Sequence, residues 1–292
     1  MRDIENKTVL VTGAASGIGF AIARAFAAAG ARVALADIDR ARLVRCCEVM
    51  AGEGRQVMPV VLDVTAASAF DRAVGEIEER FGPIDVLCNN AGVGRAKKPL
   101  VALSESDWQF IIGVNIGGML NGIRRIVPAM LARGTPAYVV NTASILGHFA
   151  IGGMADYVAT KFAALGICEA LRMELAQTNV GVSVLCPGLV HTRLQESTQA
   201  YRGREGNGEA AAAQQVQAPT PPGIEADAVG DAVLEAVREG RFYIFTHPEY
   251  AEIVERRSAE IVRALKDARR RGPADDITFL GAGVLATSRA PG

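Results

Sequence analysis

The chain has 292 residues, of which 50% are hydrophobic and 22% are charged, and its formal net charge is −1. This length and apolar content suffice for one large core, and the near-zero charge excludes the basic footprint of a nucleic-acid-binding protein. The five cysteines form no C-x-x-C pair and the three histidines lie far apart, so we expect reduced thiols and no metal site.

The N-terminal segment passes from charged residues into a short apolar run at residues 7–11. That run is too short for the core of a signal peptide or for a membrane span. We therefore expect a soluble, cytoplasmic protein with no membrane partner.

In the first half of the chain, apolar runs of strand length alternate with longer amphipathic segments. The predicted strands are residues 7–11, 32–36, 57–62 and 84–88, and the predicted helices are residues 18–29, 40–51 and 66–81. The strands are continuously apolar, which indicates burial on both faces. Strand–helix alternation of this kind predicts a parallel sheet with right-handed crossovers.

The second half repeats this rhythm. A helix is predicted from Ser104, with Asp107 placed as in a capping box, to about Ala132. Strands follow at 138–142, 182–185 and 242–245, and helices at 154–177, 225–239 and 248–271. We predict an α/β fold of the Rossmann type in one domain over residues 1–271. Its doubly wound, mostly parallel seven-stranded sheet carries helices on both faces.

Two segments break the pattern. Residues 197–223 are rich in Gly, Ala, Gln and Pro and have no clean period, so we interpret them as an insertion without regular structure that is either a substrate lid or a disordered piece, and we favour the lid. Residues 272–292 are expected to form a loose tail.

Residues 12–19 (TGAASGIG) follow a predicted strand and open a predicted helix, the context that a dinucleotide-binding loop requires. Gly13 permits a tight turn, Gly17 lets the backbone approach a pyrophosphate, and Gly19 lets the helix pack close to the strand. The first turn of the helix would offer free N–H groups and a positive dipole end to the phosphates.

Asp37 ends the second predicted strand, where a carboxylate accepts hydrogen bonds from the adenosine ribose and repels a 2′-phosphate. The next residues, Ile38 and Asp39, provide no cation for such a phosphate, and Arg40 is the only one nearby. The alternative is that Asp37 merely caps the following helix. We predict NAD as the cofactor in preference to NADP.

Tyr157 and Lys161 are four residues apart and share one face of a predicted helix, and Ser144 follows a predicted strand. An ammonium and a positive nicotinamide ring would stabilise the phenolate and lower the tyrosine pKa. Tyr157 would then exchange a proton with an alcohol or a ketone while Ser144 holds the substrate oxygen. The pair alone has an ordinary alternative as a surface Tyr–Lys contact.

Taken in order, these residues, together with 89–92 (NNAG) and Asn115, resemble the short-chain dehydrogenase/reductase family, over residues 5–190. The resemblance implies that Asn115 joins Ser144, Tyr157 and Lys161 as a catalytic residue, holding a water in a proton relay. It also implies a complete cofactor site. That site comprises Gly13, Ser16, Gly17, Ile18, Gly19, Asp37, Ile38, Asp63, Val64, Asn90, Ala91, Gly92, Tyr157, Lys161, Pro187, Gly188, Val190 and Thr192.

The family builds its substrate pocket from the segments after the fifth and sixth strands, which here are mostly apolar. The predicted lining comprises Leu146, His148, Phe149, Met154, Leu189 and Leu194, with Ile145, Ile151 and Tyr201 as further candidates. Such a lining favours a lipophilic secondary alcohol or ketone. Arg95, Lys97 and Lys98 either form a cationic surface that attracts an acidic or carrier-linked substrate, or belong to a solvated loop.

A narrower resemblance links residues 108–122 and 242–253 to bacterial Cα-dehydrogenases of lignin ethers, which oxidise benzylic alcohols with NAD. Two other functions stay open: a 3-oxoacyl-carrier reductase, against which Asp37 argues because that chemistry usually uses NADPH, and an NAD(H)-sensing binding protein. Surplus apolar residues on the helices at 104–132 and 154–177, together with the family resemblance, predict a homodimer or homotetramer.

Overall fold

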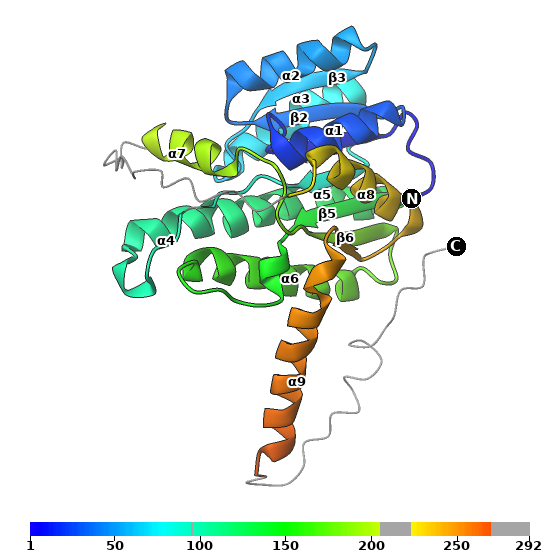
Figure 1. The fold of residues 1–292 in the computed structure, drawn as a ribbon. Helices are drawn as coiled ribbons and strands as arrows, with labels where there is room; N and C mark the ends of the chain where they lie inside the picture. Colours follow the sequence, from blue (N-terminus) through cyan, green and yellow to red (C-terminus); the bar gives the residue numbers. More distant parts are fainter. Residues whose placement is uncertain (95, 205–222, 270–292) are drawn as a thin grey trace.

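The computed structural model describes residues 1–94, 96–204 and 223–269, and its centre is a sheet of seven strands (Figure 1). The strand order is β3-β2-β1-β4-β5-β6-β7, and each neighbouring pair is parallel. This topology confirms the predicted Rossmann-type α/β fold. The strands are β1 (Thr8–Thr12), β2 (Arg32–Asp37), β3 (Val57–Val61), β4 (Val86–Asn89), β5 (Ala137–Thr142), β6 (Val180–Cys186) and β7 (Tyr243–Phe245).

Helices cover both faces of this sheet (Figure 1). They are α1 (Gly17–Ala28), α2 (Arg40–Gly52), α3 (Ala67–Phe81), α4 (Glu105–Ile112), α5 (Met119–Arg133), α6 (Ala155–Glu174), α7 (Leu194–Arg204), α8 (Ala226–Glu239) and α9 (Ala251–Asp267). Neighbouring residues of β1 point to opposite layers, because side chains alternate along a strand. Leu10 joins the hydrophobic cluster formed with α3, α5 and α6, whereas Val11 joins the cluster formed with α1, α2 and α8.

The inner and edge strands differ in burial. Every residue of β1 and β4 is buried, which explains their mostly apolar sequence. The edge strands β3 and β7 alternate between buried and less buried positions.

The long helix predicted from Ser104 begins as expected but is interrupted. The Ser104 hydroxyl accepts a hydrogen bond from the Asp107 amide, and the Asp107 carboxylate accepts one from the Ser104 amide. After α4, the chain forms a π-helical segment, η2 (Gly113–Gly118), before it continues as α5. Such segments insert an extra residue into a turn and frequently occur at functional sites. Asn115 lies within this one.

By length and hydropathy alone, Glu105–Arg133 is the one helical run in the described parts of the chain that could cross a membrane. Its apolar residues Ile111, Met119 and Ile126 pack into the hydrophobic cluster on one face of the sheet. We therefore treat this run as a core helix.

The expectation of no regular structure at residues 197–223 is wrong for residues 197–204, which belong to α7. This helix buries Thr198 and Tyr201 and carries few other apolar side chains. So sparse a pattern lacks the period that identifies a helix from sequence. The remainder of the predicted lid (205–222) and the predicted tail (272–292) lie outside the described residues.

The predicted last helix divides into a short 3-10 turn, η4 (Pro248–Tyr250), and α9. None of the residues of α9 is buried, and the helix projects from the body of the protein (Figure 1). Residues 270–271 of the prediction lie outside the described residues.

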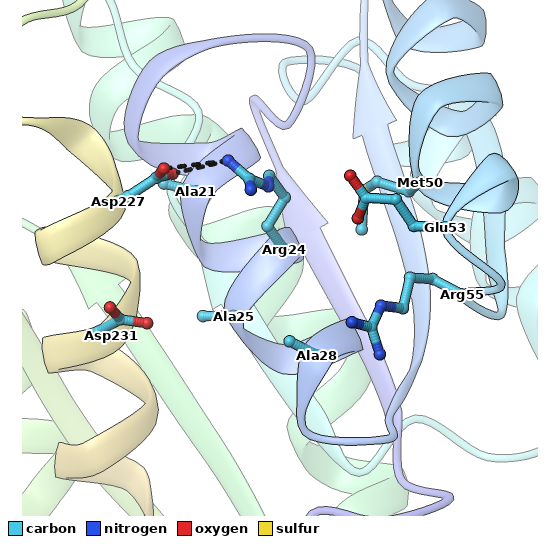
Figure 2. A pocket seen from close by; sticks show the side chains of 9 residues that line it. All are labelled: Ala21, Arg24, Ala25, Ala28, Met50, Glu53, Arg55, Asp227 and Asp231. Carbon is cyan, nitrogen blue, oxygen red and sulfur yellow. Dashed lines mark hydrogen bonds and ion pairs between the residues drawn. The ribbon is translucent and has the colours of Figure 1, made fainter.

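A crevice of about 210 Å³ lies between α1, α2 and α8 (Figure 2). Its lining is largely charged, and the guanidinium of Arg24 donates to the Asp227 carboxylate at 3.0 and 3.2 Å. The crevice contains none of the predicted site residues. The candidate site lies instead at the carboxyl ends of the strands.

Candidate active site

The carboxyl ends of the central strands bring the predicted site residues to one edge of the sheet. The glycine loop follows β1, residues 90–94 follow β4, Ser144 follows β5, and residues 187–192 follow β6. The strand order reverses direction at β1 and β4, and open α/β sheets bind ligands at such a switch point.

The glycine loop requires glycine for two physical reasons. Gly13 and Gly17 have φ angles of +66° and +52°, a region that side chains disfavour. A Cβ on Gly19 would lie 2.2 Å from the carbonyl oxygen of Gly13, so any larger residue would force the loop and helix apart. Ser16 occupies the N-cap of α1 without a side-chain capping bond, and the first turn contains no acidic residue. The N–H groups of this turn therefore stay available to an anion.

Asn90 and Ala91 brace the glycine loop. The Thr12 hydroxyl accepts hydrogen bonds from the amides of both residues at 3.0 Å. The Asn90 side-chain nitrogen, Nδ2, donates to the Thr12 carbonyl at 3.1 Å, and the Thr142 hydroxyl donates to the Asn90 side-chain oxygen at 3.3 Å. Thr12 opens the predicted glycine loop but was given no role of its own, and Thr142 was not predicted, although each is a polar residue at the carboxyl end of a mostly apolar strand.

Asp37 is held beside this loop by backbone hydrogen bonds. Its carboxylate accepts from the Ala15 amide at 3.0 Å and from the Asp39 amide at 2.9 Å. Burial raises the pKa of Asp37, and these bonds act in the opposite direction. The carboxylate therefore sits between the glycine loop and the end of β2.

Asp63 and Val64 follow β3, and α7 reaches them from the other half of the chain. The Tyr201 hydroxyl donates to both Asp63 carboxylate oxygens at 3.2 Å, and the Thr65 hydroxyl donates to one of them at 2.7 Å. Tyr201, which was a further candidate for the substrate pocket, thus lies against a predicted cofactor-binding residue. Val64 packs against the π segment, where a Cβ on Gly118 would lie 2.6 Å from its side chain.

Tyr157 and Lys161 lie one turn apart on α6, with Ser144 beside them. The Lys161 ammonium lies 5.5 Å from the centre of the Tyr157 ring and donates to the Thr142 carbonyl at 3.1 Å. The Ser144 hydroxyl lies close enough to the Tyr157 phenol to lower its pKa, and it accepts from the Leu146 amide at 3.1 Å. The structure therefore brings the three predicted catalytic side chains together.

Burial is the largest cause of the pKa shifts of Tyr157 and Lys161. It raises the pKa of Tyr157, and the nearby Ser144 hydroxyl opposes that change only in part. Burial also lowers the pKa of Lys161 to about 8. In the polypeptide without a cofactor, desolvation disfavours both charged forms. The expected lowering of the tyrosine pKa, which depends on a bound nicotinamide as well as on the ammonium, stays a prediction.

Asn115 links the segment after β4 to α6. Its side-chain oxygen accepts from the Val93 amide at 2.8 Å, and its nitrogen donates to the Val93 carbonyl and the Thr160 hydroxyl at 3.1 Å. A Cβ on Gly92 would lie 3.3 Å from the Asn115 oxygen and 3.8 Å from the Lys161 ammonium. Asn115 thus lies next to the predicted catalytic group, with both amide hydrogens used within the protein.

The residues after β6 cross between the two halves of the site. The Pro187 carbonyl accepts from the Ile145 amide at 2.9 Å, next to Ser144. Val190 forms a bridge with Ile224, and the Thr192 side chain lies where a Cβ on Gly17 would approach it to 3.0 Å.

The predicted substrate residues do not all lie at the predicted catalytic group. Leu194 borders Gly94 together with the Tyr157 ring, because a Cβ there would lie 3.1 Å from Leu194 and 3.8 Å from Tyr157. His148 and Phe149 instead contact aromatic rings of β7 and η4. The ring centroids of His148 and Phe245 lie 5.2 Å apart, and those of Phe149 and Tyr250 lie 5.8 Å apart. Leu146 and Met154 are half-buried, and Leu189 is exposed.

The cationic segment after β4 is partly neutralised. The Lys98 ammonium and the Arg202 guanidinium both lie 2.8 Å from the Asp107 carboxylate. Asp107 thereby ties this segment and α7 to the start of α4, so Lys98 is not free to receive an acidic substrate.

The chain is similar to known proteins over most of its length. The family model described as short chain dehydrogenase matches residues 7–203. A 1-deoxy-11-beta-hydroxypentalenate dehydrogenase of Streptomyces avermitilis is 38% identical over 247 residues, which cover 84% of this chain and 86% of the relative. A C alpha-dehydrogenase of a Sphingobium species is 29% identical over 268 residues, which cover 90% and 87%.

Among solved structures, a short chain dehydrogenase/reductase from Burkholderia phymatum in complex with NAD is 34% identical. It superposes with a TM-score of 0.85 and covers 95% of this chain and 100% of that one.

Proposed function

The chain belongs to the short-chain dehydrogenase/reductase family, and from that premise we propose that it is an NAD-dependent dehydrogenase of a lipophilic secondary alcohol. The family and its relatives make it an oxidoreductase that acts on hydroxyl or keto groups and uses NAD(P). The choice of NAD and the lipophilic, aromatic or benzylic substrate are our proposal. The observation that carries it is the grouping of Ser144, Tyr157 and Lys161 beside a glycine loop at one sheet edge.

The residues present fit a dinucleotide. The uncapped N-terminus of α1, with Gly13, Gly17 and Gly19 before and within its first turn, would hold the pyrophosphate. Asp37 would bind the adenosine ribose, and its negative charge opposes a 2′-phosphate, which favours NAD. When bound, the nicotinamide supplies the hydride acceptor for an alcohol or the donor for a ketone.

The remaining predicted residues would complete the cofactor site. Asp63 and Val64 would lie at the adenine, and Asn90, Ala91 and Gly92 would line the middle of the dinucleotide. Residues 187–192 would flank the nicotinamide and hold it near Tyr157.

Tyr157 would carry out the proton transfer at its phenolic oxygen. In oxidation it accepts the hydroxyl proton of the alcohol, and in reduction it donates a proton to the ketone oxygen. The Ser144 hydroxyl would hold that oxygen in line. Lys161 favours the phenolate by its positive charge, and Asn115 would connect this group to a proton relay.

A lipophilic substrate is supported by the apolar residues that border the predicted catalytic group. Leu194 adjoins the Tyr157 ring, and Leu189 is exposed on the segment after β6. Two of the relatives are named as dehydrogenases of a hydroxypentalenate and at a Cα position, and a third is named as a 3-oxoacyl-[acyl-carrier-protein] reductase. We therefore propose a bulky secondary alcohol over a sugar.

Three further features belong to this proposal. The protein would act in the cytoplasm as a homodimer or homotetramer built on the long helices α5 and α6. One domain would extend over residues 1–271, and residues 197–223 would form the substrate lid.

The test is formation of NADH from NAD, and of NADPH from NADP, over benzylic, aryl-glycerol, steroid and aliphatic secondary alcohols. We expect turnover with NAD on the aromatic or polycyclic alcohols. A preference for NADPH with a 3-ketoacyl thioester would instead favour the carrier-linked reductase. Binding of NADH without turnover of any alcohol or ketone would favour the NAD(H)-sensing protein.

A further inference from the structure

His247 lies directly beyond β7, beside the segment that follows β6. The two strands are paired in parallel, with Cys186 opposite Phe245, so residues 187–189 and residues 246–247 leave the sheet side by side. The His247 side chain is only 6% exposed, although histidine is usually found at least partly in solvent.

Both imidazole nitrogens of His247 are hydrogen-bonded to the backbone of the segment after β6. The Gly188 amide donates to Nδ1 at 3.2 Å, and Nε2 lies 2.8 Å from the Leu189 carbonyl oxygen. An amide N–H can only donate and a carbonyl can only accept, so the ring is neutral with its hydrogen on Nε2. The Thr246 hydroxyl lies 2.7 Å from Nδ1 and adds a second donor there.

The contact leaves no room for a side chain at position 188. A Cβ on Gly188 would lie 2.7 Å from the imidazole Cγ and 2.8 Å from the Tyr250 ring. Gly188 therefore permits the close approach that lets one imidazole reach the peptide groups on both sides of the Gly188–Leu189 peptide.

The segment that His247 holds is tied at its ends to both halves of the site. Its first residue, Pro187, accepts a hydrogen bond from Ile145, next to Ser144. Its last, Thr192, packs against the glycine loop at Gly17. In the middle, the Leu189 carbonyl also accepts from the Ile224 amide at 3.1 Å.

We propose that His247 is a positioning residue that fixes the Gly188–Leu189 backbone and thereby sets the place of the nicotinamide relative to Tyr157. The inference rests on the proposed function, which puts the nicotinamide against residues 187–192. His247 acts through the backbone and is not among the side chains grouped around Tyr157.

The binding test compares NADH with ADP-ribose, which shares the adenosine and pyrophosphate but lacks the nicotinamide. In His247→Phe, both backbone bonds are lost while a ring remains. We expect the Kd for NADH to rise about tenfold, because nicotinamide binding must then order a backbone that two hydrogen bonds no longer hold, while the Kd for ADP-ribose stays unchanged. Turnover should fall roughly 10- to 100-fold because the nicotinamide is misplaced.

Two conservative variants separate positioning from packing. In His247→Asn, the side-chain oxygen replaces Nδ1 as the acceptor for Gly188, and in His247→Gln, the side-chain nitrogen replaces Nε2 as the donor to Leu189. Each should recover part of the NADH affinity and turnover. Thr246→Val is the matched control, since it removes a donor to the imidazole but leaves both backbone bonds, and it should behave like the wild type.

The outcomes separate this inference from the proposed function. Wild-type protein that binds neither NADH nor ADP-ribose contradicts the proposed function and the inference with it. Wild-type protein that binds both, with folded His247→Phe, Asn and Gln variants that bind and turn over equally well, overturns the inference alone. A variant series that weakens NADH and ADP-ribose by the same factor also overturns it, because that result describes general destabilisation.

Discussion

Substitution of Lys161 measures how much the buried ammonium of the candidate site lowers the free energy of unfolding. The side chain is 6% exposed, and its burial lowers the pKa from 10.5 to about 8. At about 1.4 kcal/mol per pKa unit, the folded state loses about 3 kcal/mol at pH 7 by keeping this ammonium charged. Lys161→Met removes that cost and also one hydrogen bond, to Thr142, worth about 1 kcal/mol. We expect the variant to be more stable by about 2 kcal/mol and inactive.

The difference in unfolding free energy between Lys161→Met and the wild type should depend on pH. Between about pH 8 and pH 10.5, folded Lys161 has lost its proton while the unfolded chain still binds one, so wild-type stability rises relative to the variant. Urea unfolding at pH 7 and pH 10 should therefore show a gain for Lys161→Met that shrinks at the higher pH. Lys266→Met on exposed α9 is the control and should show no such change. A variant that is no more stable at pH 7, or a difference that is constant with pH, would refute the reasoning.

Three other substitutions test the cofactor side. Gly19→Ala places a methyl group 2.2 Å from the Gly13 oxygen, so it should destabilise the fold by about 2 kcal/mol or more and abolish NADH binding; a normal melting curve and NADH titration would contradict this. Asp37→Asn keeps an acceptor for the glycine loop but removes the charge, and it should shift the NADP-to-NAD ratio of kcat/KM toward NADP by about tenfold; an unchanged ratio would remove Asp37 from cofactor selection. Tyr201→Phe frees the Asp63 carboxylate from a hydroxyl 3.2 Å away and should tighten NADH binding about fivefold in a fluorescence titration, whereas weaker binding would mean that α7 supports the cofactor.

Local patterns sufficed to predict much of the fold and the grouping of the site. Continuously apolar runs locate strands such as β1 and β4, because buried parallel strands carry no polar face. The capping box at Ser104 and the glycines that open α1 are short-range signals with a direct structural cause. Since all strands are parallel, residues at their carboxyl ends necessarily meet at one edge.

The features that escaped prediction depend on long-range packing or on small changes of helical register. The π segment at Gly113–Gly118 interrupts an apolar pattern that reads as one helix, so its place around Asn115 is visible only in the structure. The contact of Tyr201 with Asp63 joins residues 138 positions apart, and no sequence period encodes it. His247 likewise has meaning only once β6 and β7 are known to be neighbours.

Proton transfer at the phenolic oxygen of Tyr157 is the central step of the proposed reaction. NADH binding and alcohol turnover should be measured side by side for the wild type and Tyr157→Phe, with the best alcohol from the substrate panel. We expect unchanged NADH affinity and a fall in turnover of about a thousandfold, within the usual range for the loss of a general acid or base. Turnover that survives intact in Tyr157→Phe would contradict the proposed reaction, because the proton would then be moving through another group.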